Sequence, residues 1–359
     1  MKKFDEMQII MQNRQKYGKT ESTMIYETMI KTENSDSMRD QWSEYRQALT
    51  EYIRDGIESF FRREYLSQEG LLRDHTFRLK EVKEGIPSGK KPVVAVWGAG
   101  GCNDLDLLAL APYVDFVLID RDVDAMQKAA KRFGFTEGQC QCVDIGFWEI
   151  YEEEERFFDA LLKDADDLHL SEYLRQLMDS VLKQEMMPAS YENAFDFSIV
   201  CGIASQLNAR FVGLVQGHGK DLKSLPQTVA AMQDMNVQAE KRLYGVVEFM
   251  TRCAFFTANE MCAAKPEAHG RLQEYAQIWT EEWERLLVTQ AGVQEIPMEM
   301  DGISCEVAGS REFIEEILKA QREGMLKIRH RRGMVWPFSA EKHYFMDVLT
   351  AYFVNKEIK

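Results

Sequence analysis

The sequence predicts an α/β protein built on a doubly wound, mostly parallel sheet, with an antiparallel C-terminal hairpin, an N-terminal helical appendage and a helical insertion. The first observation is that short apolar segments, such as "VVAVW" and "DFVLID", alternate with segments of helical periodicity. Because right-handed crossovers stack helices onto a buried sheet, this alternation is typical of parallel strands. The second observation is a glycine-rich turn, "GAGGCND", which follows the first apolar segment and precedes a helix.

The predicted elements divide the chain into two regions. Helical periodicity extends over residues 1–90, and "GIPSGKKP" then breaks the pattern with Gly, Pro and Ser and marks a domain boundary. Residues 91–359 are predicted to form the sheet domain, with the helical insertion at about 151–190. Strands are expected at 93–97, 115–120, 139–145, within 195–207 and at 252–261, helices at 123–134, 226–250 and 310–321, and the final hairpin within 333–354.

Composition limits the classes of function. The chain has 359 residues and a formal net charge of −15, which argues against binding to nucleic acids or to anionic membranes and favours a small-molecule substrate. It has neither the apolar core of a signal peptide nor a run of 18 apolar residues, so a cytoplasmic protein is expected. Among seven cysteines, Cys140 and Cys142 form the one close pair and lack a second pair with zinc-ligand spacing, so no metal site is predicted.

The glycine-rich turn is a candidate ligand site. Glycines allow positive φ angles and a close approach of ligand to backbone, and a helix N-terminus offers unpaired N–H groups. A phosphate-binding P-loop is excluded because no Lys-Ser or Lys-Thr follows the glycines. A dinucleotide turn of the form GxGxxG, counted from Gly98 and Gly100, would need glycine where Asn103 stands.

Two acidic residues follow the next predicted strands. Asp120 ends the second strand, where its carboxylate could accept hydrogen bonds from ribose hydroxyls, and Asp144 ends the third, within reach of an adenine amino group. Each also has a structural interpretation, because Asp120 could cap the next helix and Asp144 could stabilise a turn. Taken with the glycines, they indicate a nucleoside-binding edge, since ligands of open α/β sheets bind at the carboxyl ends of the strands.

This series of motifs resembles the class I S-adenosylmethionine-dependent methyltransferases over about residues 92–260, and the C-terminal segment is similar to the last hairpin of that fold. The resemblance implies S-adenosylmethionine as cofactor. It places the third glycine of the family's turn on Cys102, which departs from the pattern, and Asp104 could cap the following helix. The "NPPY" type of sequence is absent after the fourth strand, which disfavours methylation of DNA adenine or of glutamine side chains.

The resemblance also implies roles for individual residues. The turn would lie beside the methionine part of the cofactor, Asp120 would bind the ribose, and Asp144 would contact the adenine, with Ile145 as an apolar wall. The fourth-strand motif maps onto Asp196 to Gly202, with Ser205 and Gln206 near the mouth of the pocket. The implied cofactor-binding residues are Gly98, Ala99, Gly100, Gly101, Asp104, Asp120, Arg121, Asp144, Ile145, Cys201 and Gly202.

The expected chemistry is in-line methyl transfer to a small-molecule acceptor, for which orientation supplies most of the acceleration and a catalytic base is optional. The catalytic residue is unknown, and His218, between two glycines, is a weak candidate beside its interpretation as an exposed loop residue. The basic run Lys327 to Arg332 could hold a substrate anion or form a solvated turn, and the N-terminal helices could form a lid or the face of a homodimer. Two alternatives stay open: an NAD(P)-dependent oxidoreductase, and a degenerate methyltransferase-like domain used for protein interaction.

Overall fold

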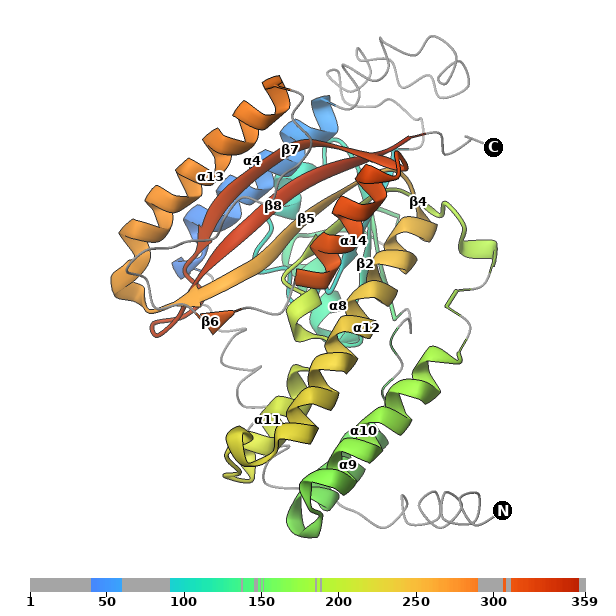
Figure 1. Cartoon of the computed structure of the whole chain (residues 1–359). Coiled ribbons are helices and arrows are strands. Elements are labelled where there is room, and N and C mark those ends of the chain that lie inside the picture. The colour runs from blue at the N-terminus through green and yellow to red at the C-terminus, as the bar shows by residue number, and fades with distance from the viewer. Residues whose placement is uncertain are drawn as a thin grey trace. The chain divides into compact units, whose positions relative to one another are not determined.

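The computed structural model describes residues 40–59, 91–136, 138–144, 148, 150, 152–184, 186–187, 189–289, 306–307 and 311–354 (Figure 1). These residues divide into two compact units. The described residues of 147–186 and 206–242 form the helical unit, and the other described residues form the sheet unit. No helix in the described part of the chain is long and apolar enough to cross a membrane.

The sheet unit contains an eight-stranded sheet whose main path has the order β3-β2-β1-β4-β5-β8-β7, with β6 paired to β5. From β3 to β5 all neighbours are parallel, whereas β8 runs antiparallel to both β5 and β7. The predicted doubly wound sheet with an antiparallel C-terminal hairpin is therefore confirmed. The strands are β1 (Val93–Trp97), β2 (Asp115–Ile119), β3 (Cys140–Val143), β4 (Phe195–Cys201), β5 (Thr251–Ala264), β6 (Glu306–Val307), β7 (Leu326–Trp336) and β8 (His343–Phe353).

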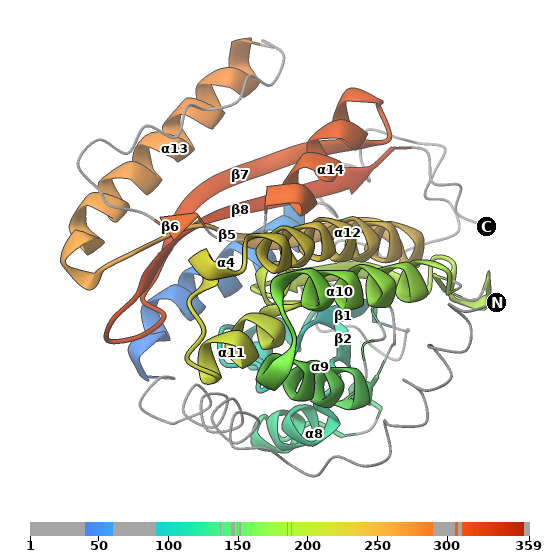
Figure 2. The ribbon, with the colours of Figure 1, turned by 60° about the horizontal axis from the view of Figure 1, so that its bottom comes forward.

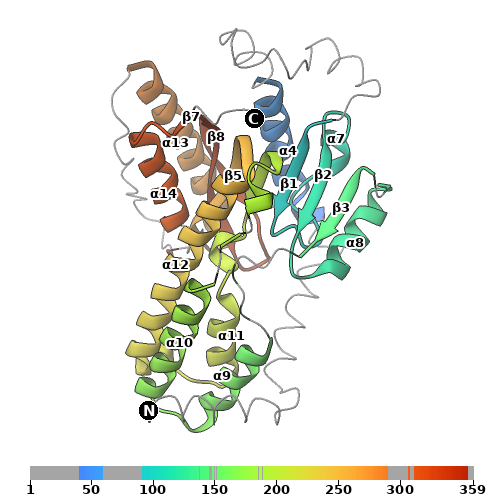
Figure 3. The ribbon, with the colours of Figure 1, turned by 90° about the vertical axis from the view of Figure 1, so that its right-hand side faces the viewer.

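The helices that follow β1 and β2 are labelled α7 and α8 in Figure 3, and an aspartate caps the start of each. Asp106 caps α7 (Leu107–Leu110) by accepting hydrogen bonds from the backbone N–H groups of Leu108 and Ala109. The expectation that Asp104 caps this helix is therefore wrong, because the cap lies two residues later. In the same way Asp122 caps α8 (Val123–Arg132), so the helix-capping interpretation of Asp120 is wrong as well.

Helices cover both faces of the sheet, as the alternation of side chains along β5 shows. Phe256 faces α4, where a Cβ added at Gly56 would lie 2.5 Å from its ring, so glycine permits this close packing. Phe255 faces the opposite side, and Tyr244 meets both Phe255 and Phe313 edge to face. The helices concerned are α4 (Ser43–Ser59), which is the described part of the predicted N-terminal helical region, α12 (Pro226–Met250) and α14 (Arg311–Arg322).

A buried ion pair anchors the C-terminal hairpin, along which α14 lies in Figure 2. Arg331 of β7 donates from Nε and Nη2 to both carboxylate oxygens of Asp347 on β8, and both side chains are buried. Trp279 of α13 (His269–Thr289) donates its indole N–H to the same carboxylate. The solvated-turn interpretation of the basic run is thus wrong, because these residues lie in strand β7.

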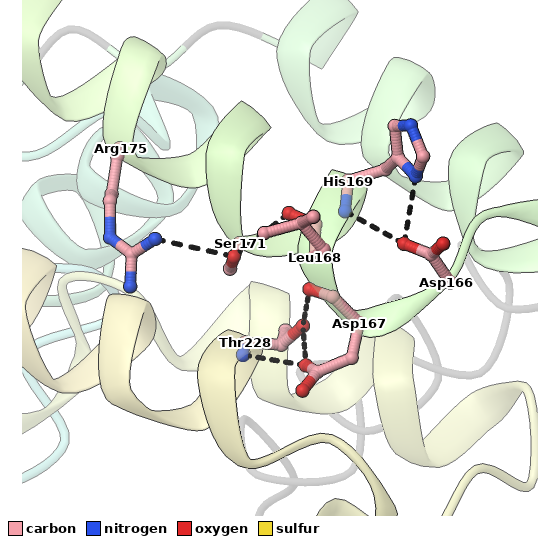
Figure 4. A network of polar contacts seen from close by, with 7 residues as sticks. All are labelled: Asp166, Asp167, Leu168, His169, Ser171, Arg175 and Thr228. Carbon is pink, nitrogen blue, oxygen red and sulfur yellow. Dashed lines mark hydrogen bonds and ion pairs between the residues drawn. The ribbon is translucent and has the colours of Figure 1, made fainter.

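The helical unit is held by side-chain caps between its helices (Figure 4). Asp166 caps α10 (Asp167–Leu182) through the His169 N–H. Asp167 accepts hydrogen bonds from the N–H groups of Gln227 and Thr228 and thereby caps α12. The unit includes residues of 206–242 in addition to the predicted insertion. Its other described helices are α9 (Glu152–Asp164) and α11 (Ala209–Gly217). The 3₁₀ helices among the described residues of both units are η3 (Ala189–Tyr191), η4 (Ala204–Gln206), η5 (Leu222–Ser224) and η6 (Pro266–Ala268).

Replacing Asp347 by Ala is expected to lower the free energy of unfolding by about 3 to 5 kcal/mol, because the Arg331 charge stays buried without this carboxylate. Urea denaturation followed by tryptophan fluorescence measures the change. Arg54→Ala is the control, since its ion pair with Asp55 is exposed to solvent and its loss should cost less than about 1 kcal/mol. Equal losses in the two variants would contradict the assignment of Arg331 and Asp347 as the anchor of the hairpin.

Candidate functional site

The strand order places a topological switch point at the carboxyl edge of the parallel sheet. From β1 the chain proceeds outward to β2 and β3 on one side, and then returns to β4 and β5 on the other side. At such a switch point the loops after β1 and β4 separate, and ligands of open α/β sheets bind there. The glycine-rich turn follows β1 and Gly202 follows β4, so both lie at this edge.

The turn after β1 contains residues with positive φ angles, which glycine adopts more readily than other residues. Gly98 and Gly100 have φ angles of +65° and +44°, and Cys102 has a φ of +48°. The N–H groups of Gly98 and Ala99 donate to the Ile119 carbonyl, which ties the turn to the end of β2. Cys102 therefore keeps the left-handed conformation at the position where the family pattern has its third glycine, although it carries a side chain.

Asp120 joins this turn to the loop after β2. Its Oδ2 accepts a hydrogen bond from the Gly100 N–H at 2.9 Å, and its Oδ1 accepts one from the Asp122 N–H at 2.8 Å. Burial raises the pKa of Asp120, and these backbone hydrogen bonds oppose that rise. The half-buried carboxylate is thereby fixed in orientation at the switch point, with acceptor capacity left for hydroxyl donors.

Residues that sequence reasoning missed hold the turn from two sides. Arg132 of α8 donates from Nη2 to the Gly101 carbonyl at 2.7 Å. From α4, Arg46 donates to the Asn103 carbonyl at 3.0 Å, and the Thr50 hydroxyl accepts from the Asp106 N–H at 2.9 Å. The position of Arg132 in the last turn of an adjacent helix could have indicated its contact, whereas no local pattern indicates that α4 packs here.

Glu260 of β5 and Trp336 of β7 lie beside the loop after β4. Gly202 has a φ of +63°, and a Cβ added there would lie 3.4 Å from Glu260 Oε1 and 3.6 Å from the Trp336 ring. Burial and then the charge of Glu260 raise the pKa of Asp104 to about 6. Cys201 is buried in the same region, and burial raises its thiol pKa well above the usual value. Glu260 and Trp336 stand in strand patterns that resemble core, so the sequence did not single them out.

The other residues that the resemblance implies at the cofactor site lie in the loops after β2, β3 and β4 where the structure describes them. Asp144 is exposed directly after β3, Arg121 is exposed after β2, and Ile145 lies outside the described residues. Ser205 and Gln206 form part of η4 after β4. Asp196, the first residue of the fourth-strand motif, lies at the amino end of β4, where it accepts a hydrogen bond from the Val93 N–H and pairs with Arg252.

His218 belongs to the helical unit rather than to the sheet unit that carries the glycine turn. It caps the C-terminus of α11, and its Nε2 lies 2.9 Å from Oδ1 of the buried Asp159 on α9. The interpretation of His218 as an exposed loop residue is therefore wrong, and its catalytic role stays a prediction. Among the described residues, no group of three or more His, Cys, Asp or Glu side chains could hold a metal ion.

A groove of about 810 Å³ lies between α4 and α13 over β7. Its walls mix aromatic and polar side chains, including Tyr52, Gln277 and Arg332. Tyr45 lines the groove and also stacks on Trp336, with ring centroids 5.5 Å apart.

Comparisons with known proteins give no match to a family model or to a curated protein. Among solved structures, the chain is similar to an S-adenosylmethionine-dependent methyltransferase from Methanosarcina mazei, with a TM-score of 0.34 and 8% identity over 74% of this chain and 94% of that one. It is also similar to a provisionally named RNA methyltransferase from Pyrococcus horikoshii, with a TM-score of 0.33 and 11% identity over 77% and 79% of the two chains. A third similar structure is an N-methyltransferase from Bradyrhizobium japonicum in complex with S-adenosylhomocysteine, with a TM-score of 0.30 and 10% identity over 83% and 98%.

Gly98→Ala is expected to destabilise the protein more than Gly134→Ala, although both glycines have positive φ angles, of +65° and +72°. Both variants pay about 1 to 2 kcal/mol for a left-handed alanine, but only at Gly98 would the new Cβ clash, 2.6 Å from Ile203 Cβ. Nothing lies within 4 Å of a Cβ at Gly134. Chemical denaturation of the two variants measures the difference, and equal stabilities would show that the turn does not pack against Ile203.

The raised pKa of Asp104 predicts a pH dependence of stability. Its folded-state pKa of about 6 exceeds the ordinary value of 3.8, so between these values the folded state binds more protons than the unfolded state. The contribution of Asp104 to stability therefore falls as pH rises through about 6. Denaturation of wild type and Asp104→Asn from about pH 4 to pH 8 should show the variant gaining stability relative to wild type as pH rises. A constant difference between them would mean that the Asp104 pKa is not raised.

Proposed function

We propose that this chain is an S-adenosylmethionine-dependent methyltransferase that acts on a small-molecule acceptor. The observation that carries the proposal is the pairing of the positive-φ turn after β1 with the oriented Asp120 carboxylate at the switch point of the sheet. This pairing offers backbone access on one side and an acceptor for ribose hydroxyls on the other. This arrangement fits a nucleoside ligand.

The sheet supports a single nucleoside over a dinucleotide. A dinucleotide fold repeats its mononucleotide-binding half and continues with a sixth parallel strand. In this chain the position beside β5 is taken by β8, which is antiparallel. Asn103 also stands where the dinucleotide turn needs its third glycine. These features favour the methyltransferase over the NAD(P)-dependent oxidoreductase.

The residues present fit the cofactor that we propose. Gly98 and Gly100 carry no side chain where its methionine part would approach the backbone, and Asp120 would accept from the two ribose hydroxyls. The exposed Asp144 would accept from the adenine amino group. When bound, the cofactor supplies a methyl group on a positively charged sulfur. The left-handed Cys102 argues against the degenerate alternative, because the turn keeps its shape without the third glycine.

The chain itself would act by orientation. Arg132 and Arg46 fix the carbonyl groups of the turn, and Asp120 fixes its N–H, so the methyl group would be presented in one direction. Well-oriented reactants gain on the order of 7 to 11 kcal/mol over free encounter. The net charge of −15 supports a small-molecule acceptor over RNA, whose phosphates are bound mainly by clustered Lys and Arg.

Calorimetric titration of the full chain tests this function. S-Adenosylmethionine and S-adenosylhomocysteine are expected to bind, whereas NAD and NADP are not. Asp120→Ala and Asp120→Asn should weaken binding about tenfold or more, because hydrogen bonds to a charged carboxylate are lost. Asp122→Asn is the matched control, since asparagine keeps the capping oxygen of α8 and should leave the affinity unchanged.

The other outcomes identify the alternatives. Binding of NAD or NADP without the sulfur compounds would favour the oxidoreductase. No binding by any of the four compounds would favour the interaction domain. Equal affinity in wild type and in both Asp120 variants would remove the ribose role of this carboxylate.

A further inference from the structure

The groove between α4 and α13 is a cavity whose lining shares no residue with the proposed cofactor site. Its volume of about 810 Å³ lies within the range of small-molecule sites, which is roughly 300 to 1,000 Å³. Aromatic and polar side chains alternate along its walls, as is usual where a ligand is both enclosed and oriented. The groove is therefore large enough, and chemically varied enough, to hold a small molecule of its own.

Strand β7 supplies the positive charges of the groove. The Arg331 guanidinium is already held by Asp347 of β8, and Arg329 is exposed. Arg332 differs from both, because it is half-buried and no carboxylate of the described residues forms an ion pair with it. Its guanidinium instead lies 5.5 Å from the centre of the Tyr52 ring. An arginine stays charged at ordinary pH, so a half-buried guanidinium without a carboxylate favours an anion that comes from outside.

Exposed carboxylates line the same groove from its helical walls and limit the charge of the ligand. Glu44 and Asp55 belong to α4, and Glu281 belongs to α13. Together they repel ligands with several negative charges, such as nucleic acids, whereas water and salt screen their effect on a single charge. A carboxylate also matches the planar fork of a guanidinium, with which it forms two parallel hydrogen bonds. The charges of the groove thus favour a ligand with one carboxylate.

The outer edge of β7 is closed to an added strand within the groove. Among the described strands β7 pairs only with β8, so its other edge has no strand beside it. The Gly333 N–H on β7 nevertheless donates to Thr280 Oγ1 of α13 at 3.1 Å, and a Cβ added at Gly333 would lie 2.6 Å from Ala276 Cα. Side chains that cover an edge in this way protect it from pairing with another chain. The covered edge favours a small molecule over an extended peptide.

We propose that this groove binds a small organic carboxylate and that Arg332 pairs with its carboxylate group. Tyr52 would keep the arginine in position, because its ring lies beside the guanidinium while its hydroxyl donates to the His330 carbonyl at 2.9 Å. The apolar part of the ligand would contact Tyr45 and Met334, which also line the groove. This site is separate from the proposed methyltransferase site and does not depend on it.

The probes are 2-naphthoate, which is an anion at neutral pH, and 2-naphthamide, its neutral analogue. Calorimetric titration measures the binding of each to the full chain. 2-Naphthoate should bind about tenfold or more tightly than 2-naphthamide, because hydrogen bonds between charged groups are stronger than those to a neutral amide. Arg332→Gln should remove most of this preference. Lys327→Gln is the matched control and should keep it, since Lys327 is an exposed cation of the same strand outside the lining of the groove.

A second variant guards against a loss of folding, which thermal melting of each variant detects. Arg332→Lys keeps the positive charge but loses the planar fork. It should therefore lower the preference for 2-naphthoate to a value between those of wild type and Arg332→Gln.

The outcomes separate this inference from the proposed function. No binding of 2-naphthoate, equal binding of the two probes, or a preference that survives both substitutions of Arg332 overturns the carboxylate site. The cofactor that we propose also carries a carboxylate, so the titration is repeated with S-adenosylhomocysteine in excess. Unchanged affinity for 2-naphthoate supports a separate site, whereas its displacement means that the anion occupies the cofactor site, and the inference fails. If S-adenosylhomocysteine does not bind wild type, the proposed function alone is rejected, because the comparison of the two probes does not need it.

Discussion

The hydrogen bond from the Gly100 N–H to the Asp120 carboxylate is the constraint on which the candidate site depends. It joins the loops after β1 and β2, and it requires both the left-handed backbone of the turn and the parallel register that ends β1 and β2 side by side. Arg132, Arg46 and Thr50 then add contacts to a turn whose shape this bond has already set. The shape of the turn thus depends on its own backbone and on the Asp120 carboxylate, and the other side chains add to it.

The antiparallel end of the sheet determines what faces that turn. Because β8 lies between β5 and β7, the end of β7 and the start of β8 meet the carboxyl end of β5. Trp336, Tyr344 and Glu260 consequently arrive at the same edge as the loop after β4. A sheet that stayed parallel would place a crossover helix there instead. The same departure that argues against a dinucleotide therefore also brings Glu260 and Trp336 to this edge.

The sequence predicted the parts of this structure that local patterns determine. Alternating apolar strands and helices, the glycines at 98 and 100, and Asp120 at a strand end all depend on spacing along the chain, and the structure has them in the predicted elements. Contacts between distant segments could not be predicted, as Arg46 on the Asn103 carbonyl and Glu260 beside Gly202 illustrate. The aspartate that caps each helix was also not predicted correctly. Asp104, Asp106, Asp120 and Asp122 all lie near helix starts, and only the backbone angles determine which of them is the cap.

Trp42, which directly precedes α4, donates its indole N–H to the carbonyl of Phe338, which is 296 residues later in the chain. The last strand, β8, is moreover an interior strand of the sheet, so the pairing of β5 with β7 is made through it. During synthesis on the ribosome, α4 and strands β1 to β5 are therefore made before the segment that they pack against, and the sheet beyond β5 cannot form until β8 has been synthesised. Contacts of such high sequence separation fold slowly and expose strand edges in the meantime. Truncation of the C-terminal strand would accordingly remove the interior of the sheet and not merely its border.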